Sequence, residues 1–261
     1  METISAPVGR NSPNHPADVG AVQRLLKRAA AVYARPDVDP GPVDEDYGDG
    51  TDAGIDSFQN FWTRRPDGVV DPGGRTIRRL RAASDIGDVD AVFPLTFSPA
   101  ANFRTGMRAF SARRGGGSRA HAGADLYGPV ETPVFAVAPG VVTRVAAFYG
   151  KTDAVEVDHG AFIVRYGEVY PDVSVGDRVE RGQAIGTGKV GRIGRLILRG
   201  KPFKYSMCHF EMYDKTGPEG WGLTQKSRSR SAIHVPTSRP FYRRSDLIDP
   251  TPLLSAWPLP R

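Results

Sequence analysis

From residue 119 to the C-terminus, short apolar runs alternate with glycine and proline turns, and this pattern restricts the fold more than any other feature. No stretch of this half carries apolar residues at helical spacing over several turns. Short runs rich in Val, Ile and Phe between turn residues are typical of strands, and they lie at 134–138, 141–145, 154–158, 162–166 and 184–186. We therefore expect a mostly antiparallel β domain of sandwich or open-barrel type over residues 119–261, closed by a C-terminal strap.

The first 82 residues carry the opposite pattern. An apolar stripe at helical spacing begins at Val19, a second covers 55–62, and Thr76 starts a third, short helix. A dense turn signal at 66–74 separates the last two. We expect a small three-helix domain over residues 1–82, a linker and entry strand over 83–118, and hence an α+β multidomain chain.

Charge and composition narrow the class of protein. The net charge of +6 is unevenly distributed, with −4 over residues 1–100 and +10 over 101–261, so the second part should face an acidic partner.

The single cysteine, Cys208, excludes an internal disulfide framework and a Cys-rich zinc finger. No apolar run approaches the ~18 residues of a membrane span. The first residues lack the basic start and apolar stretch of a Sec signal peptide, which predicts synthesis in the cytoplasm.

Three residues of the β half form a candidate metal site. His121 and Asp125 stand four apart, and even spacing in an extended segment places both on one face. His209 follows in another strand-like run. Two histidines and one carboxylate, with a fourth position left to water, are the ligand set of a catalytic zinc site. Such a zinc acidifies its water and polarises a carbonyl, although a His-x-x-x-Asp spacing alone also occurs in sites that bind nothing.

The residues around these three resemble the lysostaphin-type (LytM-type) zinc endopeptidases. The matching blocks occur in order over about 119–213: His121-x-Gly-x-Asp, Thr132-Pro-Val-x-Ala, Val155-Glu-Val-Asp-His-Gly, Val175-Gly-Asp-Arg-Val-Glu-Arg-Gly-Gln and His209-Phe-Glu. The resemblance implies that His121, Asp125 and His209 bind Zn²⁺. It also implies a mostly antiparallel β fold and cleavage of peptide bonds in bacterial peptidoglycan.

The sequence departs from that family at two positions. The family's Tyr-x-His-Leu reads Tyr166-Gly-Glu-Val here, and Met207 replaces the first histidine of His-x-His. A carboxylate can carry the proton instead, so Glu168 is the expected base. Strand alternation places Tyr166 on the same face, where its hydroxyl would stabilise the oxyanion. The alternative is a degenerate domain that keeps the fold and binds peptidoglycan as a scaffold without turnover.

Two further residues are candidates for supporting the ligands. Glu211 shares a strand face with His209 and is expected to hydrogen-bond its imidazole. His159, in Asp-His-Gly, is expected either to line the cleft or to stabilise a turn. His234 and the basic loop at 226–230 remain less specific. Aromatic residues do not interleave with that loop as a base-stacking platform requires, so we expect no nucleic-acid partner.

The first segment resembles the small helical peptidoglycan-binding domain of wall hydrolases. The matching pieces over about 8–82 are Asp18-Val-Gly-Ala-Val-Gln-Arg-Leu-Leu, Gly54-Ile-Asp-Ser-Phe-Gln and Asp67-Gly-Val-Val-Asp-Pro. This resemblance implies wall binding, with a spacer or docking role as the alternative.

Together these features predict a zinc-dependent peptidoglycan endopeptidase. The Tyr-Gly-Glu and Met-x-His variant resembles cargo of type VI secretion. That resemblance implies an antibacterial effector that acts in the periplasm or wall of a target cell, with a secretion-apparatus carrier and an immunity protein as partners. A phage lysin is the alternative.

Overall fold

The computed structural model describes most of the chain, and these are its ranges: 2–63, 65–185, 192–193, 197–198, 200–202, 206–225 and 239–261. The basic loop at 226–230 and His234 lie outside them. The chain falls into two compact units. The first contains Met1–Asp88 with the described residues of Asp214–Ser238 and Tyr242–Asp246. The second contains Val89–Tyr213, Arg239–Phe241 and Leu247–Arg261.

The first unit is built on helices whose apolar faces pack together. Its elements are β1 (Val8–Gly9), α1 (Pro16–Val32), the 3-10 helix η1 (Pro36–Val38), α2 (Asp49–Gln59), β2 (Val69–Val70) and α3 (Arg75–Gly87). Pro16 suits the first turn of α1, where a missing N–H costs nothing. Leu26, Ile55 and Leu80, one from each helix, are fully buried, so the stripes seen in the sequence form one core.

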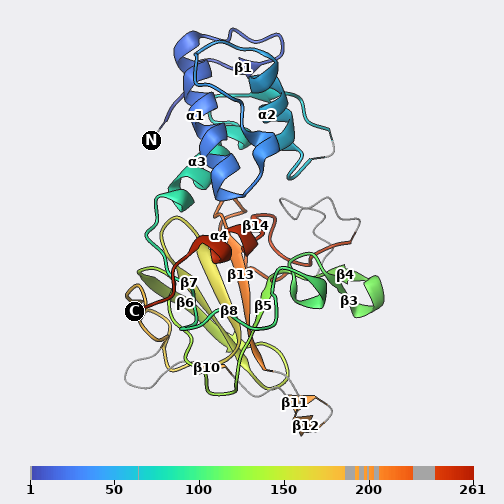
Figure 1. Ribbon diagram of the computed structural model, residues 1–261, viewed down its shortest axis with the longest axis vertical. Helices are drawn as coiled ribbons and strands as arrows, with labels where there is room; N and C mark the ends of the chain where they lie inside the picture. The colour runs from blue at the N-terminus through green and yellow to red at the C-terminus, as the bar shows by residue number, and fades with distance from the viewer. Residues whose placement is uncertain are drawn as a thin grey trace. The chain divides into compact units, whose positions relative to one another are not determined.

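The second unit is built on an antiparallel sheet (Figure 1). Its path runs β14 (Leu247–Ile248), β13 (Met207–Tyr213), β8 (Ile163–Tyr170), β7 (Asp153–Asp158), β6 (Gly140–Ala147) and β9 (Arg178–Val179). Two further strands belong to the sheet outside this order: β5 (Ala124–Tyr127) pairs with β13, and β10 (Arg192–Ile193) pairs with β8. The remaining elements are η2 (Gly106–Arg108), β3 (Arg113–Arg114), η3 (Gly115–Gly117), β4 (Arg119–Ala120), β11 (Ile197–Leu198), β12 (Lys201–Pro202) and α4 (Thr251–Ala256).

The mostly antiparallel sheet predicted from the sequence is confirmed, with differences in detail. The runs at 141–145, 154–158 and 162–166 lie largely in β6, β7 and β8. The runs at 134–138 and 184–186 contribute one isolated bridge between Phe135 and Ala184; Gly186 lies outside the described residues. The C-terminal strap contains both β14 and the short helix α4.

The structure of residues 83–118 differs more from the linker and entry strand expected there. Helix α3 continues to Gly87, and the second unit begins at Val89. Val92, Phe93 and Phe103 are buried in that unit. These apolar side chains pack against its core, so residues 89–118 form part of the second unit instead of joining two domains freely.

Candidate metal centre

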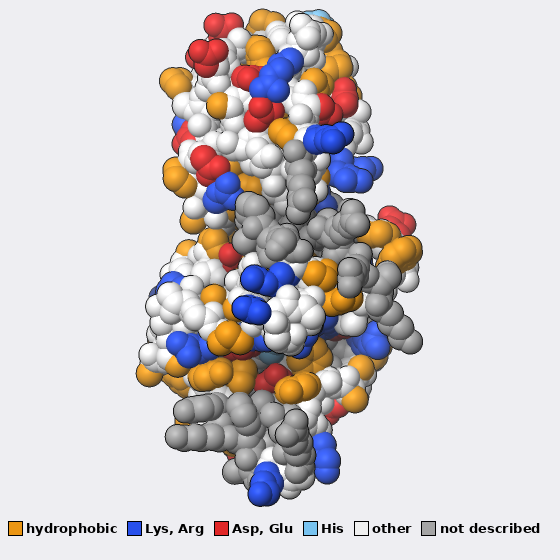
Figure 2. All heavy atoms as spheres, turned by 90° about the vertical axis from the view of Figure 1, so that its right-hand side faces the viewer, with side chains coloured by type: hydrophobic (Ala, Val, Ile, Leu, Met, Phe, Trp, Pro, Cys, Tyr) orange, Lys and Arg blue, Asp and Glu red, His pale blue; other side chains and the backbone are white. Residues whose placement is uncertain are grey.

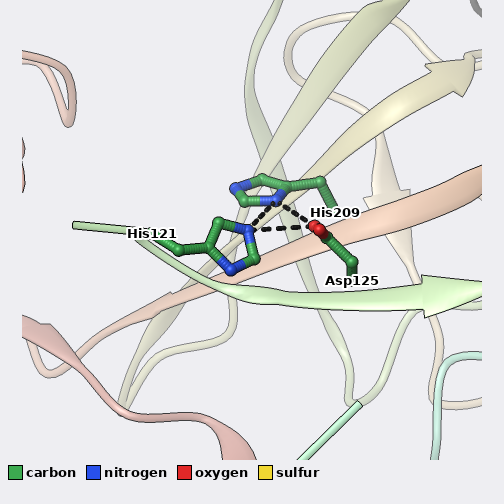
Figure 3. Close-up of side chains that lie close together, drawn as sticks. All are labelled: His121, Asp125 and His209. Carbon is green, nitrogen blue, oxygen red and sulfur yellow. Dashed lines mark hydrogen bonds and ion pairs between the residues drawn. The ribbon is translucent and has the colours of Figure 1, made fainter. Parts of the chain in front are cut away.

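His121, Asp125 and His209 point toward one another from two neighbouring segments (Figure 3). Nε2 of His121 lies 3.0 Å from Oδ1 of Asp125 and 3.1 Å from Nδ1 of His209. Nδ1 of His209 lies 2.8 Å from the same Asp125 oxygen. All three side chains are buried. Three possible ligand atoms therefore converge on one point.

The opposite side of each ligand is already occupied by a hydrogen bond. His121 donates from Nδ1 to the Ala109 carbonyl at 2.7 Å, and His209 donates from Nε2 to Glu211 at 3.0 Å. Oδ2 of Asp125 accepts a hydrogen bond from Arg114 at 2.7 Å. These bonds leave the imidazole lone pairs and a carboxylate oxygen facing each other. Such an arrangement is repulsive unless a cation or proton lies between them, so the donor set fits zinc.

The charges in the cluster favour a positive centre. Burial alone would lower the pKa of His209, but the carboxylates of Asp125 and Glu211 outweigh it and raise that pKa to about 9. Burial would raise the pKa of Asp125, but hydrogen bonds from His121 and His209 hold it well below its usual range. Burial lowers the pKa of His121. At neutral pH the metal-free cluster therefore combines an ionised carboxylate with one neutral and one protonated imidazole, and binding of a metal ion would release the proton of His209.

Strand pairing explains how residues 84 positions apart meet. In the β5–β13 ladder, Asp125 lies directly opposite His209. Gly123 lies between the two ligands of the first segment, and a Cβ there would come 2.2 Å from the Phe210 carbonyl oxygen. Only glycine allows the backbone before β5 to approach β13 this closely. The His-x-Gly-x-Asp pattern thus has a steric cause.

A buried ionic network holds the His209 imidazole. Glu211 accepts from His209 on one oxygen, and its other oxygen accepts from Arg165 at 3.0 Å and from the Tyr213 hydroxyl. Arg165 also donates to Glu156 at 2.7 Å. The contact between Glu211 and His209 is the one expected from the sequence, while the sequence reasoning missed Arg165.

Glu168 occupies an irregular position in β8. In the β7–β8 ladder, Asp153 pairs with Val169 and Ala154 with Gly167, so Glu168 is the extra residue of a β-bulge, and its φ is +61°. Burial raises the pKa of its carboxyl to about 7, and the nearby charges acting on it are those of His209, Asp125 and Arg114. Its Oε2 is buried without a hydrogen-bond partner. A buried carboxyl group with one unpartnered oxygen beside a ligand cluster suits a proton carrier.

The structure corrects the role expected for Tyr166. The bulge breaks the alternation that would have placed Tyr166 beside Glu168. Tyr166 is fully buried and packs edge-on against Phe210, whose side chain alternates with that of His209 along β13. Its hydroxyl accepts from the Val137 N–H at 3.0 Å and lies 3.1 Å from Nε2 of His159. This hydroxyl is committed within the core and does not serve an oxyanion.

Of the two alternatives expected for His159, its contacts favour the structural one. Its Nδ1 lies 3.1 Å from the Pro139 carbonyl oxygen and its Nε2 contacts Tyr166. Burial lowers its pKa to about 4, so the ring is neutral at neutral pH. His159 therefore has a structural role beside Tyr166.

Sequence reasoning also missed the residues that shape the rim. Phe148 stacks on His209, with ring centroids 5.5 Å apart and an interplanar angle of 28°. Gly167 lies opposite His209, and a Cβ there would come 2.7 Å from the Phe148 ring. Arg114 lies in the segment expected as a linker and entry strand, where sequence reasoning assigned it no role at the site. In the lower part of Figure 2, histidine and carboxylate atoms reach the surface in a small area that has Lys and Arg side chains above it and hydrophobic side chains below it.

Several solved structures are similar to parts of the chain. A zinc-containing peptidase from Vibrio cholerae is 22% identical over 47% of this chain and 37% of its own, with a TM-score of 0.34. The catalytic domain of lysostaphin from Staphylococcus simulans is 18% identical over 57% of this chain and 90% of its own, with a TM-score of 0.36. LytU is 20% identical over 63% and 95%, with a TM-score of 0.38. The chain thus spans little more than a third of the Vibrio protein.

A family model gives the more specific match. Residues 119–218 match Peptidase family M23, and no curated protein sequence matches the chain. The matched segment contains His121, Asp125 and His209 together with Glu168 and Glu211. Residues 119–218 are therefore similar to peptidase family M23, and the match covers all three residues whose ligand atoms converge.

Proposed function

We propose that this protein is a zinc-dependent endopeptidase that hydrolyses a stem or cross-link peptide bond of bacterial peptidoglycan. The convergence of His121 Nε2, Asp125 Oδ1 and His209 Nδ1 within about 3 Å supports this proposal. The M23 match over residues 119–218 supports the substrate class.

The three ligand residues and Glu168 have different roles in the proposed reaction. His121, Asp125 and His209 would hold zinc, which supplies a Lewis acid that polarises a carbonyl and lowers the pKa of water. Glu168 takes a proton from the attacking water and returns it to the leaving amine. Its burial and its unpartnered oxygen keep this carboxyl available for that transfer.

Digestion of purified sacculi tests the proposal. The zinc-loaded protein should release muropeptides whose masses identify the bond cut, as read by liquid chromatography and mass spectrometry. Asp125→Ala should bind zinc poorly and release none. A wild-type protein that is fully loaded with zinc but releases nothing would instead support the degenerate alternative, which the methionine at position 207 favours.

We further propose that the protein is an antibacterial effector that acts in the periplasm or cell wall of a target cell. Peptidoglycan lies outside the cytoplasmic membrane, so cytoplasmic expression in a Gram-negative host should be harmless. The same chain with an added Sec signal should round or lyse the cells, and its Asp125→Ala form should not. Toxicity confined to the cytoplasmic form would point to an intracellular target.

A further inference from the structure

Two buried polar atoms of opposite character lie near the ligand cluster without a hydrogen-bond partner. One is the donor Nη1 of Arg114, and the other is the acceptor Oε2 of Glu168. Arg114 also donates from Nη2 to Asp125, and its charge acts on Glu168, His121 and Asp125's neighbour Tyr127. Buried polar atoms without partners are rare and costly, so a missing donor and a missing acceptor at one site point to a molecule that binds both.

Backbone pairing holds Arg114 firmly beside the cluster. Strand β3 pairs with β4, with Arg114 opposite Arg119. The Ser111 N–H donates to the His121 carbonyl and the His121 N–H donates to the Ala112 carbonyl, both at 2.8 Å. The turn between the strands, Gly115–Gly117, has φ values of +54°, +66° and +101°, a conformation that favours glycine. The Arg114 backbone is thus tied to the segment that carries His121.

Neither Tyr166, the expected oxyanion donor, nor Met207, which replaces a family histidine, supplies a donor to this site. Tyr166 uses its hydroxyl within the core. Met207 carries a thioether, which has no proton to donate. Within the described part of the chain, Arg114 is the cationic side chain that contacts a ligand of the cluster and retains an unpaired buried N–H group.

We propose that Arg114 is a catalytic residue, which donates from Nη1 to the oxygen of the scissile carbonyl while Nη2 holds Asp125. This inference rests on the proposed hydrolysis. The water oxygen bonds to the carbonyl carbon, Glu168 takes the water proton, the C–N bond breaks, and that proton passes to the amine. Arg114 keeps its protons and stabilises the negative charge on the oxygen. A guanidinium can contact two acceptors at once, which an ammonium on a flexible stem does less well.

The full chain carrying Arg114→Lys tests this role, because lysine keeps the charge near Asp125 but lacks the planar fork that holds two acceptors in fixed geometry. Arg113→Lys is the matched control: its exposed side chain donates to the Gly116 carbonyl instead. We would measure zinc affinity, kcat and KM on cross-linked muropeptides, and the affinity of the zinc-loaded protein for a phosphinic pseudo-dipeptide of alanine, whose tetrahedral centre carries the oxygen that Arg114 would contact.

Arg114→Lys should keep stoichiometric zinc, lower kcat about 10²- to 10³-fold with KM changed less than about threefold, and weaken phosphinate binding by a comparable factor. Arg113→Lys should match the wild type in all three. The inference is overturned if Arg114→Lys binds phosphinate as the wild type does, or if it recovers full kcat in excess zinc, which would show that Arg114 only positions Asp125.

Failure of the proposed function gives a different result. If the wild type cleaves no muropeptide, the phosphinate measurement still decides the role of Arg114, because binding needs no turnover. Weaker phosphinate binding by Arg114→Lys would then support the inference, and absence of phosphinate binding by the zinc-loaded wild type would overturn it.

Discussion

Glu168 combines burial, a strained backbone and a carboxyl oxygen without a partner. A non-glycine residue at φ +61° costs free energy, and such conformations concentrate at functional sites. The bulge that imposes it separates Glu168 from the environment of Tyr166. At the scale of the residue, the proton carrier is therefore defined by a local irregularity.

Substitution of Glu168 by glutamine should remove the base and leave the metal. The amide keeps the size of the side chain but cannot accept the proton, so kcat should fall by about 10²-fold or more while zinc content stays stoichiometric. Endopeptidase rate on defined muropeptides, with zinc measured in parallel, checks this. Glu180→Gln, at an exposed position of the same unit, is the control. A fully loaded and fully active Glu168→Gln protein would exclude Glu168 as the base.

The same variant should change the pH dependence of stability in metal-free protein. Burial raises the folded-state pKa of Glu168 from 4.5 to about 7, so the folded state holds this proton more tightly than the unfolded state. The wild type should therefore lose stability as the pH rises from 4.5 to about 7. Glutamine stays neutral, so Glu168→Gln should be more stable than the wild type at pH 8, by an amount on the order of 1–3 kcal/mol.

Thermal unfolding with a chelator present checks this prediction at two pH values. The gain in Tm should be present at pH 8 and vanish near pH 4.5. An equal difference at both pH values would show that charge on Glu168 is not its cause.

The element that determines the site is strand β13, which pairs with β5, β8 and β14. Its residue His209 lies opposite Asp125 on one side and Gly167 on the other. Two glycines make room: Gly123, just before β5, for the Phe210 carbonyl, and Gly167, in β8, for the Phe148 ring. The close packing of three strands thus brings the ligand atoms within reach of one ion.

Gly123→Ala should disrupt this packing. Its methyl group would come 2.2 Å from the Phe210 carbonyl oxygen, so the segment carrying His121 must move away from β13. We expect zinc affinity to fall at least tenfold and unfolding free energy to drop by about 1–3 kcal/mol. Competition with a zinc chelator and a denaturation curve measure the two effects. Gly48→Ala, where no atom lies within 4 Å of the new methyl group, should leave zinc affinity unchanged.

At the scale of the whole molecule, the two units are not two continuous halves of the chain, because each contains segments that are distant in sequence. The described residues of Asp214–Ser238 belong with the N-terminal helices. Within that first unit, Arg79 and Asp214 form a buried ion pair at 3.4 Å. A fragment that lacks residues 1–88 would leave the Asp214 carboxylate without this arginine. No helix of the described residues is long and apolar enough to cross a bilayer.

We further propose that residues 1–82 bind peptidoglycan, as their resemblance implies. The full chain carrying Asp125→Ala should sediment with insoluble sacculi, and the fragment 89–261 with the same substitution should bind at least tenfold more weakly. Because an unpaired buried charge destabilises a fold, the fragment should also carry Asp214→Asn, and its melting curve should confirm that it is folded. Equal sedimentation of both proteins would assign wall binding to the second unit.

Much of the architecture and the ligand cluster follows from local sequence. Helical stripes and short Val- and Ile-rich runs separate the two kinds of structure, since hydrophobic periodicity reports directly which face of an element is buried. His121, Asp125 and His209 stand out because few residue types bind zinc and their neighbours fit a known pattern. The contact between Glu211 and His209 follows from alternation along a regular strand.

Tertiary structure alone decided which side chains surround that cluster. A one-residue bulge redirected Glu168 and left Tyr166 in the core, and alternation cannot reveal a bulge because an extra residue has no periodic signature. The expected linker and entry strand gave Arg114 no role, and the pairing of β3 with β4 places it against Asp125. Arg165, Phe148 and His159 likewise acquire their roles from partners distant in sequence. Such contacts depend on strand register and packing in three dimensions, which no local pattern specifies.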